Sequence, residues 1–203
     1  MNRLVATTVI AMLLVAPAAA ETRSHSGFDS VGAQDQITVI ITVGGEYSVD
    51  VSGPDAERVL TEVEDGTLKI RQRSRSWFGN HNLDATVRIS MPELESVAAA
   101  RGVELTASGV NAQHFEIAAA MGAEVRVTGT CRSLDAAAAM GAVIRADELL
   151  CETAEVAAAM GGDARVYASQ TYEGAASMGG SINVSGDGAS RGNSTAMGGT
   201  IND

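Results

Sequence analysis

Aromatic side chains are scarce in this chain of 203 residues, and their scarcity limits the core it can build. The sequence holds three Phe, three Tyr and one Trp, against 22 Gly. Aromatic side chains normally contribute a large part of the apolar area buried in a globular core. We therefore expect a narrow core made of small side chains.

Positive charge is also scarce. The chain has 14 Lys and Arg against 25 Asp and Glu, a formal net charge of −11 that becomes −12 when a leader containing Arg3 is removed. Nucleic acids and anionic lipid surfaces are bound chiefly through Lys and Arg. This balance argues against both as the main partner.

The first 20 residues have the features of a secretory signal peptide. Arg3 precedes an apolar run over 4–16, and small residues at 18–20 form a cleavage site. No later apolar run approaches the roughly 20 residues needed to cross a bilayer. We expect cleavage near Ala20, a mature chain without a membrane span, and a periplasmic or secreted location.

The second half of the chain repeats one short phrase at a nearly fixed period. AAARG, AAAMG, AAAMG, AAAMG, ASMGG and TAMGG follow one another, and the first glycines of these phrases lie 20, 19, 20, 18 and 19 residues apart. A period of this size is typical of a solenoid, in which each turn buries its apolar face against the next. The pattern predicts a β-solenoid of about six turns over 93–203.

Alignment of the repeats on these glycines separates inward from outward positions. Apolar residues stand three positions after each glycine and, as far as Val184, five positions after it; before the glycines at 122, 141, 161 and 179, the residues five and seven positions earlier are apolar or glycine. Strand side chains alternate between faces, so these columns point inward. The outward columns are polar, and equivalent residues of stacked turns should lie about 4.8 Å apart.

Residues 28–92 show a different pattern. The β-branched runs at 37–43 and 47–52 flank Gly44 and Gly45, which predicts a hairpin. Pro54 precedes apolar residues at helical spacing up to Val63, which predicts one short helix. We therefore expect an all-β fold with a flexible mature N-terminus at 21–27 and a single domain at 28–203, divided into N-terminal strands with one helix (28–92) and solenoid repeats (93–203).

Two cysteines occupy equivalent places in consecutive repeats. Cys131 and Cys151 each stand ten positions before the next repeat glycine. Stacking would bring their Cα atoms about 4.8 Å apart, within the range that a disulfide tolerates. Export to an oxidising compartment favours a structural disulfide, and no CxxC pattern indicates redox or metal chemistry.

Two outward columns carry charge. The acidic column contains Glu116, Asp135, Glu155 and Glu173, and the basic column contains Arg126, Arg145 and Arg165. Stacked carboxylates either remain in solvent or recruit cations such as Ca²⁺, although the calcium-binding repeat pattern is missing and no firm metal site follows. We expect the arginines to pair with nearby acids; recognition of an acidic sugar or phosphate is the alternative.

A methionine precedes each of the last five repeat glycines, at Met121, Met140, Met160, Met178 and Met197. Methionine is an adaptable filler of irregular cores, so we expect these side chains to pack into the corners of the solenoid. Thioethers in a row are also soft ligands for Cu(I), which is the alternative interpretation.

One segment combines basic and aromatic residues: Arg73, Arg75, Trp77 and Phe78. Trp and Arg are enriched at interface hot spots, so this loop is a candidate partner contact. A loop that covers the open end of the solenoid would use the same residues. No Ser, His and Asp order suggests a nucleophile with its base, so we expect neither an enzyme nor a cofactor.

The phrases together resemble a bacterial family, the putative auto-transporter adhesin head GIN domain proteins. The resemblance rests on FDSV at 28–31, the GGEYSVDVSG phrase at 44–53, EDGTLKI at 64–70, VRISMPELESV at 87–97 and the repeats down to the final GGTIND. It implies an exported right-handed solenoid of parallel strands with no assigned activity.

Two main hypotheses on function follow, and a weak glycan-active enzyme is a third. The first is a non-enzymatic adhesive or scaffolding surface in the cell envelope, with an envelope protein or polysaccharide as partner. The alternative is a periplasmic protein that binds cations or glycans through the stacked acidic and arginine columns. The exposed strand edge of the last turn also suggests end-to-end self-association.

Overall fold

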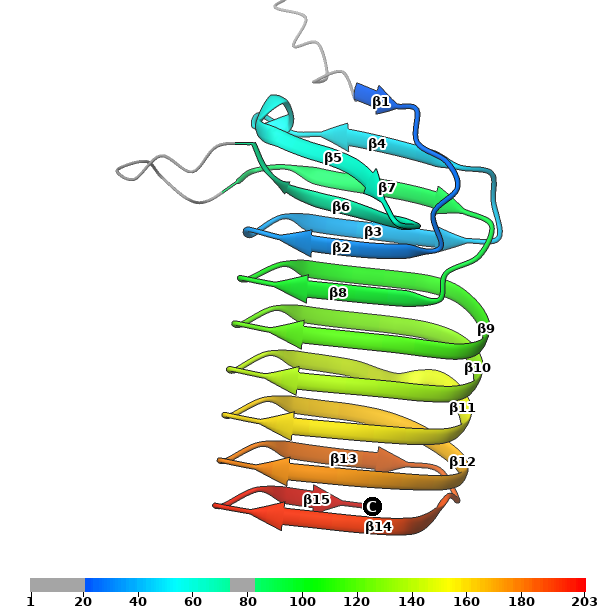
Figure 1. Cartoon of the computed structure of the whole chain (residues 1–203), viewed down its shortest axis with the longest axis vertical. Coiled ribbons are helices and arrows are strands. Elements are labelled where there is room, and N and C mark those ends of the chain that lie inside the picture. Colours follow the sequence, from blue (N-terminus) through cyan, green and yellow to red (C-terminus); the bar gives the residue numbers. More distant parts are fainter. Residues whose placement is uncertain (1–20, 74–82) are drawn as a thin grey trace, which may run out of the picture.

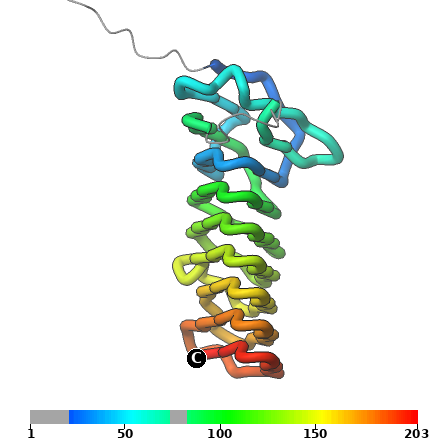
Figure 2. The backbone as a smooth tube through the Cα atoms, turned by 90° about the vertical axis from the view of Figure 1, so that its left-hand side faces the viewer, coloured from blue at the N-terminus to red at the C-terminus, as the bar shows by residue number. Residues whose placement is uncertain are grey.

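A computed structural model describes residues 21–73 and 83–203 and shows a slender stack of flat coils (Figures 1 and 2). Each coil has one strand in each of two facing layers. In the repeats a single long strand bends at one edge, so that its first half lies in one layer and its second half in the other. The solenoid comprises about five turns, one fewer than predicted.

We call the first layer the arginine sheet. Its strands lie in the order β1 (Glu21–Arg23), β4 (Ser48–Ser52), β7 (Thr86–Met91), β3 (Thr38–Val43), the first halves of β9 (Glu104–Ala120), β10 (Glu124–Ala139), β11 (Val143–Ala159) and β12 (Asp163–Ser177), then β13 (Ser181–Ser185) and β15 (Thr200–Asn202). All pairs from β7 onward are parallel, whereas β4 pairs antiparallel with both β1 and β7.

We call the second layer the alanine sheet. Its strands lie in the order β5 (Val59–Glu64), β6 (Thr67–Gln72), β2 (Ser30–Gln34), β8 (Ser96–Ala100), the second halves of β9 to β12, and β14 (Ala189–Ala196). Only β5 runs antiparallel to its neighbour. The two layers thus present two broad outer faces with different side chains.

The core is narrow and is made by the inward columns that the sequence predicts. Leu105, Val125 and Ile144 of the arginine sheet face Phe115 and Leu134 of the alanine sheet, and all five are buried. Because small residues such as Ala136 and Gly174 occupy other inward positions, the layers can approach closely.

From β9 onward, a two-residue turn of Met and Gly joins each coil to the next along one edge (left in Figure 1). Met121 and Gly122 have φ of 54° and 73°, and the N–H of Ala123 donates to the carbonyl of Ala120 at 3.3 Å. Two positive φ values define a type I′ turn, which suits the twist of the flanking strands. Gly122 N–H also donates to the carbonyl of Met140 at 3.1 Å, so consecutive turns are held in register.

The predicted hairpin across Gly44 and Gly45 is wrong. β3 and β4 do not pair with each other, because β7 lies between them and pairs with both. Val87, Ile89 and Met91 of β7 all point into the core, so the inserted strand adds buried apolar area between its two neighbours. The hairpin of this region is β5–β6 instead.

The predicted short helix is also largely wrong. Only Ala56–Arg58 forms a single 3₁₀ turn, and the residues that follow are strand β5. Val59, Thr61 and Val63 alternate with more exposed neighbours, and β-branched residues at this period favour a strand over a helix. Asp65 and Gly66, both with positive φ, form the turn into β6.

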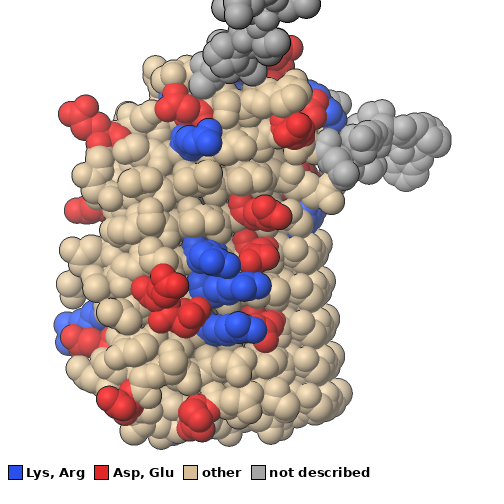
Figure 3. Space-filling view, turned by 180° about the vertical axis from the view of Figure 1, so that it is seen from behind, with Lys and Arg blue, Asp and Glu red and all other residues tan. Residues whose placement is uncertain are grey.

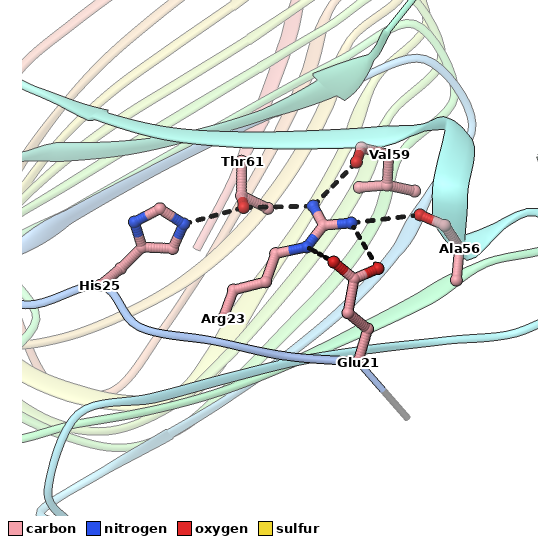
Figure 4. A network of polar contacts seen from close by, with 6 residues as sticks. All are labelled: Glu21, Arg23, His25, Ala56, Val59 and Thr61. Atoms are coloured by element: carbon pink, nitrogen blue, oxygen red, sulfur yellow. Dashed lines mark hydrogen bonds and ion pairs between the residues drawn. The ribbon is translucent and has the colours of Figure 1, made fainter. Parts of the chain in front are cut away.

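The segment 21–27, predicted to be flexible, is anchored at its start by β1. Arg23 donates to the carbonyl of Val59 at 2.8 Å and to that of Ala56 at 3.3 Å, and it pairs with Glu21 at 3.2 Å (Figure 4). Thr61 contacts both Arg23 and His25. Because β1 belongs to one sheet and Val59 begins β5 of the other, this network ties the two layers together at the N-terminal end.

The C-terminal coil is polar inside along β14, whereas Ile201 of β15 still packs against the core. Asn193 and Thr195 of β14 stand in register with the inward Gly174 and Ala176 of β12. Tyr172, which is buried, receives a hydrogen bond from Asn193 and donates one to the carboxylate of Asp203. Solenoids commonly end in a turn with polar residues, because such a turn can face water.

The two cysteines form the disulfide that the sequence predicts. Cys131 and Cys151 face each other in the register of β10 and β11, with Cα atoms 4.5 Å apart. Both are buried. The bond joins two coils at the edge where the long strands bend, opposite the Met-Gly turns.

Candidate functional site

The arginine column lies on the outer face of the arginine sheet, where Figure 3 shows stacked cationic groups between acidic ones. Arg126, Arg145 and Arg165 are in register on β10, β11 and β12. Glu124 lies 3.8 Å from Arg126 and 3.2 Å from Arg145, and Asp163 lies 3.5 Å from Arg165. The structure confirms the predicted pairing within this face.

A bulge in β11 brings further acids to the same column. The pairing register shifts between Ala146 and Leu150, and the displaced Asp147 and Glu148 line a small hollow of about 130 Å³ together with the three arginines. The sequence did not reveal this bulge, because the repeat length stays near its usual value there. With acids on both sides, the arginine column has no excess positive charge to attract an anion.

The acidic column is also in register. Glu116, Asp135, Glu155 and Glu173 follow one another on β9 to β12, and all are exposed. Among the described residues, however, no group of three or more His, Cys, Asp or Glu side chains is arranged to hold a metal ion. The carboxylates form a line along the sheet and do not converge on one point.

The structure places a histidine, a serine and an aspartate together on the alanine sheet. His114 Nδ1 lies 3.0 Å from Ser133 Oγ, and His114 Nε2 lies 3.6 Å from Asp135. Ser133 also donates its hydroxyl hydrogen to the carbonyl of Gln113 at 3.3 Å. The His114 and Asp135 side chains are 57% and 51% exposed, which is unlike a catalytic site closed to water.

The outer face of the alanine sheet carries a broad uncharged surface beside the acidic column. We call it the alanine strip; it is made of two columns, of which the first contains Ala98, Ala118, Ala137, Ala157 and Ala175 and the second contains Ala100, Ala120, Ala139, Ala159 and Ser177. All ten side chains are exposed or half-buried. The alanine runs are visible in the sequence. They form a surface because every second alanine side chain points outward from the sheet.

At its N-terminal end the alanine strip is hollowed. Alanines of β8 to β10 form the floor of an open depression of about 510 Å³, and Lys69 and Arg71 of β6 line it. Both cations are paired along the β5–β6 hairpin: Lys69 with Glu64 at 2.5 Å, and Arg71 with Glu62 at 2.7 Å. The depression is therefore apolar at its floor and neutral in charge at its wall.

The methionines do not pack into the corners, so that prediction is wrong. The side chain of the first central residue in a type I′ turn points away from the strands, and here Met121, Met140, Met160 and Met178 are 43–47% exposed and Met197 76%. We call these five residues the methionine column. It borders the alanine strip on the side opposite the acidic column.

The candidate partner loop falls mostly outside the described residues. Arg73 is exposed, and its N–H donates to the carbonyl of Arg58 at 2.7 Å. Arg75, Trp77 and Phe78 lie in the segment 74–82, which the structure does not describe. The role predicted for this loop stays a prediction.

Comparison with known proteins agrees with this architecture. The family model described as putative auto-transporter adhesin, head GIN domain, matches residues 27–188. A putative adhesin from Bacteroides fragilis has a similar structure, with a TM-score of 0.62 and 16% identity over 91% of this chain and 94% of its own. A protein from Parabacteroides distasonis described as a putative lipid binding protein has a TM-score of 0.52 and 19% identity over 93% of this chain and 97% of its own.

Two further comparisons complete the description. No curated protein matches the chain. Over residues 21–73 and 83–203, no helix is long and apolar enough to span a membrane.

Proposed function

The chain belongs to the putative auto-transporter adhesin head GIN domain family, and we propose that it is an exported, non-enzymatic adhesive protein whose contact surface is the alanine strip with the flanking acidic column. The observation that carries this proposal is the uncharged strip, which continues over five successive rungs of one sheet. Contiguous exposed apolar surfaces of soluble proteins commonly mark interaction sites.

The opposite face is a weaker candidate. On the arginine sheet each stacked arginine has an acid within 4 Å. A partner there would have to compete with ion pairs that already exist. The alanine strip has no such internal partners, so its apolar area gains free energy only by meeting another surface.

The charge of the face indicates the partner. The carboxylates of Glu116, Asp135, Glu155 and Glu173 run parallel to the strip at the spacing of the strands. A complementary surface would offer an apolar stripe beside a row of Lys or Arg. The strip carries no aromatic ring on which a sugar could stack, which favours a protein of the cell envelope over a polysaccharide.

End-to-end self-association has less support. A second copy that stacked on the last coil would cover the inward Asn193 and Thr195 of β14. Burial of polar groups without new hydrogen bonds is unfavourable. We therefore place the contact on the broad face and not at this end.

The test is attachment of residues 21–203 to envelope fractions and intact cells of the source bacterium. Ala137→Lys with Ala157→Lys puts two long cations in the middle of the strip, at exposed positions that a folded chain tolerates. We expect attachment to weaken at least about tenfold, since both the apolar contact and the charge complementarity are lost. Thr106→Lys with Thr200→Lys adds the same charge to exposed positions of the arginine sheet and should leave attachment unchanged.

Equal attachment by the two double variants would overturn the proposal, provided that both melt within a few degrees of the parent chain. If only the Thr106→Lys with Thr200→Lys variant lost attachment, the contact surface would be assigned to the arginine sheet. A Ca²⁺-dependent thermal shift that disappears on neutralising the acidic column would favour cation binding instead.

A further inference from the structure

The methionine column cannot be explained by packing. Of the eight methionines in the sequence, two lie in the leader, Met91 is fully buried, and the other five form this exposed column. Burial normally makes a large apolar side chain such as methionine contribute favourably to the free energy of folding, and an exposed methionine loses much of this contribution. Their recurrence at every turn therefore needs another cause.

Backbone preference does not explain the column either. The five methionines have φ between 47° and 54°, in the left-handed region. Gly, Asn and Asp are preferred at this position of a type I′ turn, whereas an unbranched apolar residue gains nothing there. The chain itself uses Asp65 in the β5–β6 turn and Arg101 in the first Met-Gly-like turn, so the geometry does not require methionine.

The turns hold the methionines in a regular line. The carbonyl of each of Met121, Met140, Met160 and Met178 accepts a hydrogen bond from the glycine N–H of the preceding turn, at 3.1–3.2 Å. Consecutive methionine Cα atoms are thus fixed about one strand spacing apart, roughly 4.8 Å. Methionine has three rotatable side-chain bonds, so thioethers of neighbouring rungs can approach one ion.

The chemistry of the column selects one class of ligand. A thioether is a neutral, soft donor that suits Cu(I) and Ag(I) and not hard cations such as Ca²⁺. The two cysteines of the chain are joined in a disulfide, so they offer no competing thiolate. The alanine strip beside the column contributes no oxygen donors other than Ser177 Oγ and backbone groups.

We propose that the methionine column binds soft monovalent metal ions, Cu(I) foremost, through thioethers of adjacent rungs. The ion binds as Cu(I) and stays Cu(I), so no oxidant or reductant is involved. Because a thioether carries no proton in the physiological range, binding should be independent of pH between about 5.5 and 8, unlike binding by His or Cys.

The test is a titration of residues 21–203 with Ag(I) in chloride-free buffer by calorimetry, and with Cu(I) under anaerobic conditions against a colorimetric Cu(I) chelator. Replacing all five methionines of the column with Leu keeps size and hydrophobicity but removes sulfur. We expect affinity for both ions to fall more than about tenfold. Met140→Leu with Met160→Leu breaks the line in its middle and should lower the number of ions bound.

Met91→Leu is the matched control, since this methionine is buried away from the column, and it should bind like the parent chain. Equal binding by the five-Leu chain, or no Ag(I) binding by the parent chain, would overturn the proposal. Affinity that falls steeply below pH 6.5 and is lost in His114→Ala would assign the ion to histidine instead. The five-Leu chain keeps the alanine strip and its charge, so its attachment to envelope fractions separates this proposal from the adhesive one.

Discussion

The two broad faces of the solenoid are built by the same repeats but differ in what they leave unsatisfied. On the arginine sheet, Arg126, Arg145 and Arg165 have acidic neighbours within 4 Å. On the alanine sheet, the strip carries no charge, and the acidic column beside it has little internal compensation. The charged side chains of the arginine column are therefore a poor indication of a binding face, because they are already paired. The uncharged alanine strip is the surface that would gain free energy by contact with a partner.

The largest expected effect is a difference in the free energy of unfolding between substitutions on the inner and on the outer face of the alanine sheet. Ala138 is 2% exposed, whereas its neighbour Ala137 is exposed. Ala138→Asp should lower the free energy of unfolding by more than about 3 kcal/mol, because it buries a charge without a partner. Ala137→Asp should change it by less than about 1 kcal/mol. Urea denaturation of both variants measures the difference, and similar losses would show that the strip is not an outer surface.

A second comparison removes the charges of each face in turn. Neutralising the acidic column with Glu116→Gln, Asp135→Asn, Glu155→Gln and Glu173→Gln should weaken attachment about tenfold at low salt and abolish its salt dependence. Arg126→Gln, Arg145→Gln and Arg165→Gln should leave attachment unchanged. Binding curves at several NaCl concentrations decide the matter, and a stronger effect from the arginine variant would reverse the roles of the two faces.

The smallest effect concerns the ion pair at the N-terminal end of the alanine sheet. The hydrogen bond and charge of Lys69 lower the pKa of Glu64 from its usual 4.5. A lowered carboxyl pKa stabilises the fold above the unfolded value and loses this contribution as the pH falls through the folded value. The stability gap between the parent chain and Glu64→Gln should therefore be present at pH 7 and shrink below about pH 4.5.

Urea denaturation between pH 7 and pH 2.5 measures this gap. Lys69→Gln serves as the control, since it removes the same pair and leaves the carboxyl in place. A gap that stays constant down to pH 2.5 would show that the pair contributes nothing to stability.

Much of the solenoid could be predicted from the sequence because the repeat period and the alternation of apolar residues can both be read from the sequence itself. The period near 19 residues gives the stacking, and the alternation of apolar residues assigns columns such as Leu105, Val125 and Ile144 to the core. The same alignment predicts the disulfide between Cys131 and Cys151. Register follows from the repeat, so residues about 20 apart become neighbours.

The failures have physical causes of two kinds. The pairing of β3 and β4 with β7 depends on a strand more than 30 residues away, which no local turn signal reveals. The prediction that the methionines fill the corners is wrong because an apolar character does not place a side chain inside when its turn position directs it outward. A residue followed by Gly between two strands indicates a type I′ turn, in which the first side chain points outward.

The most direct test of the adhesive face uses the exposed methionines as reporters in the unmodified chain. Residues 21–203 are treated briefly with peroxide, free and attached to envelope fractions at saturation, and oxidation of each methionine is followed by mass spectrometry. If the alanine strip is the contact surface, Met140 and Met160 at its border should become protected on attachment, while the buried Met91 reacts slowly in both states. Equal oxidation of Met140 and Met160 in the free and attached protein would contradict the account.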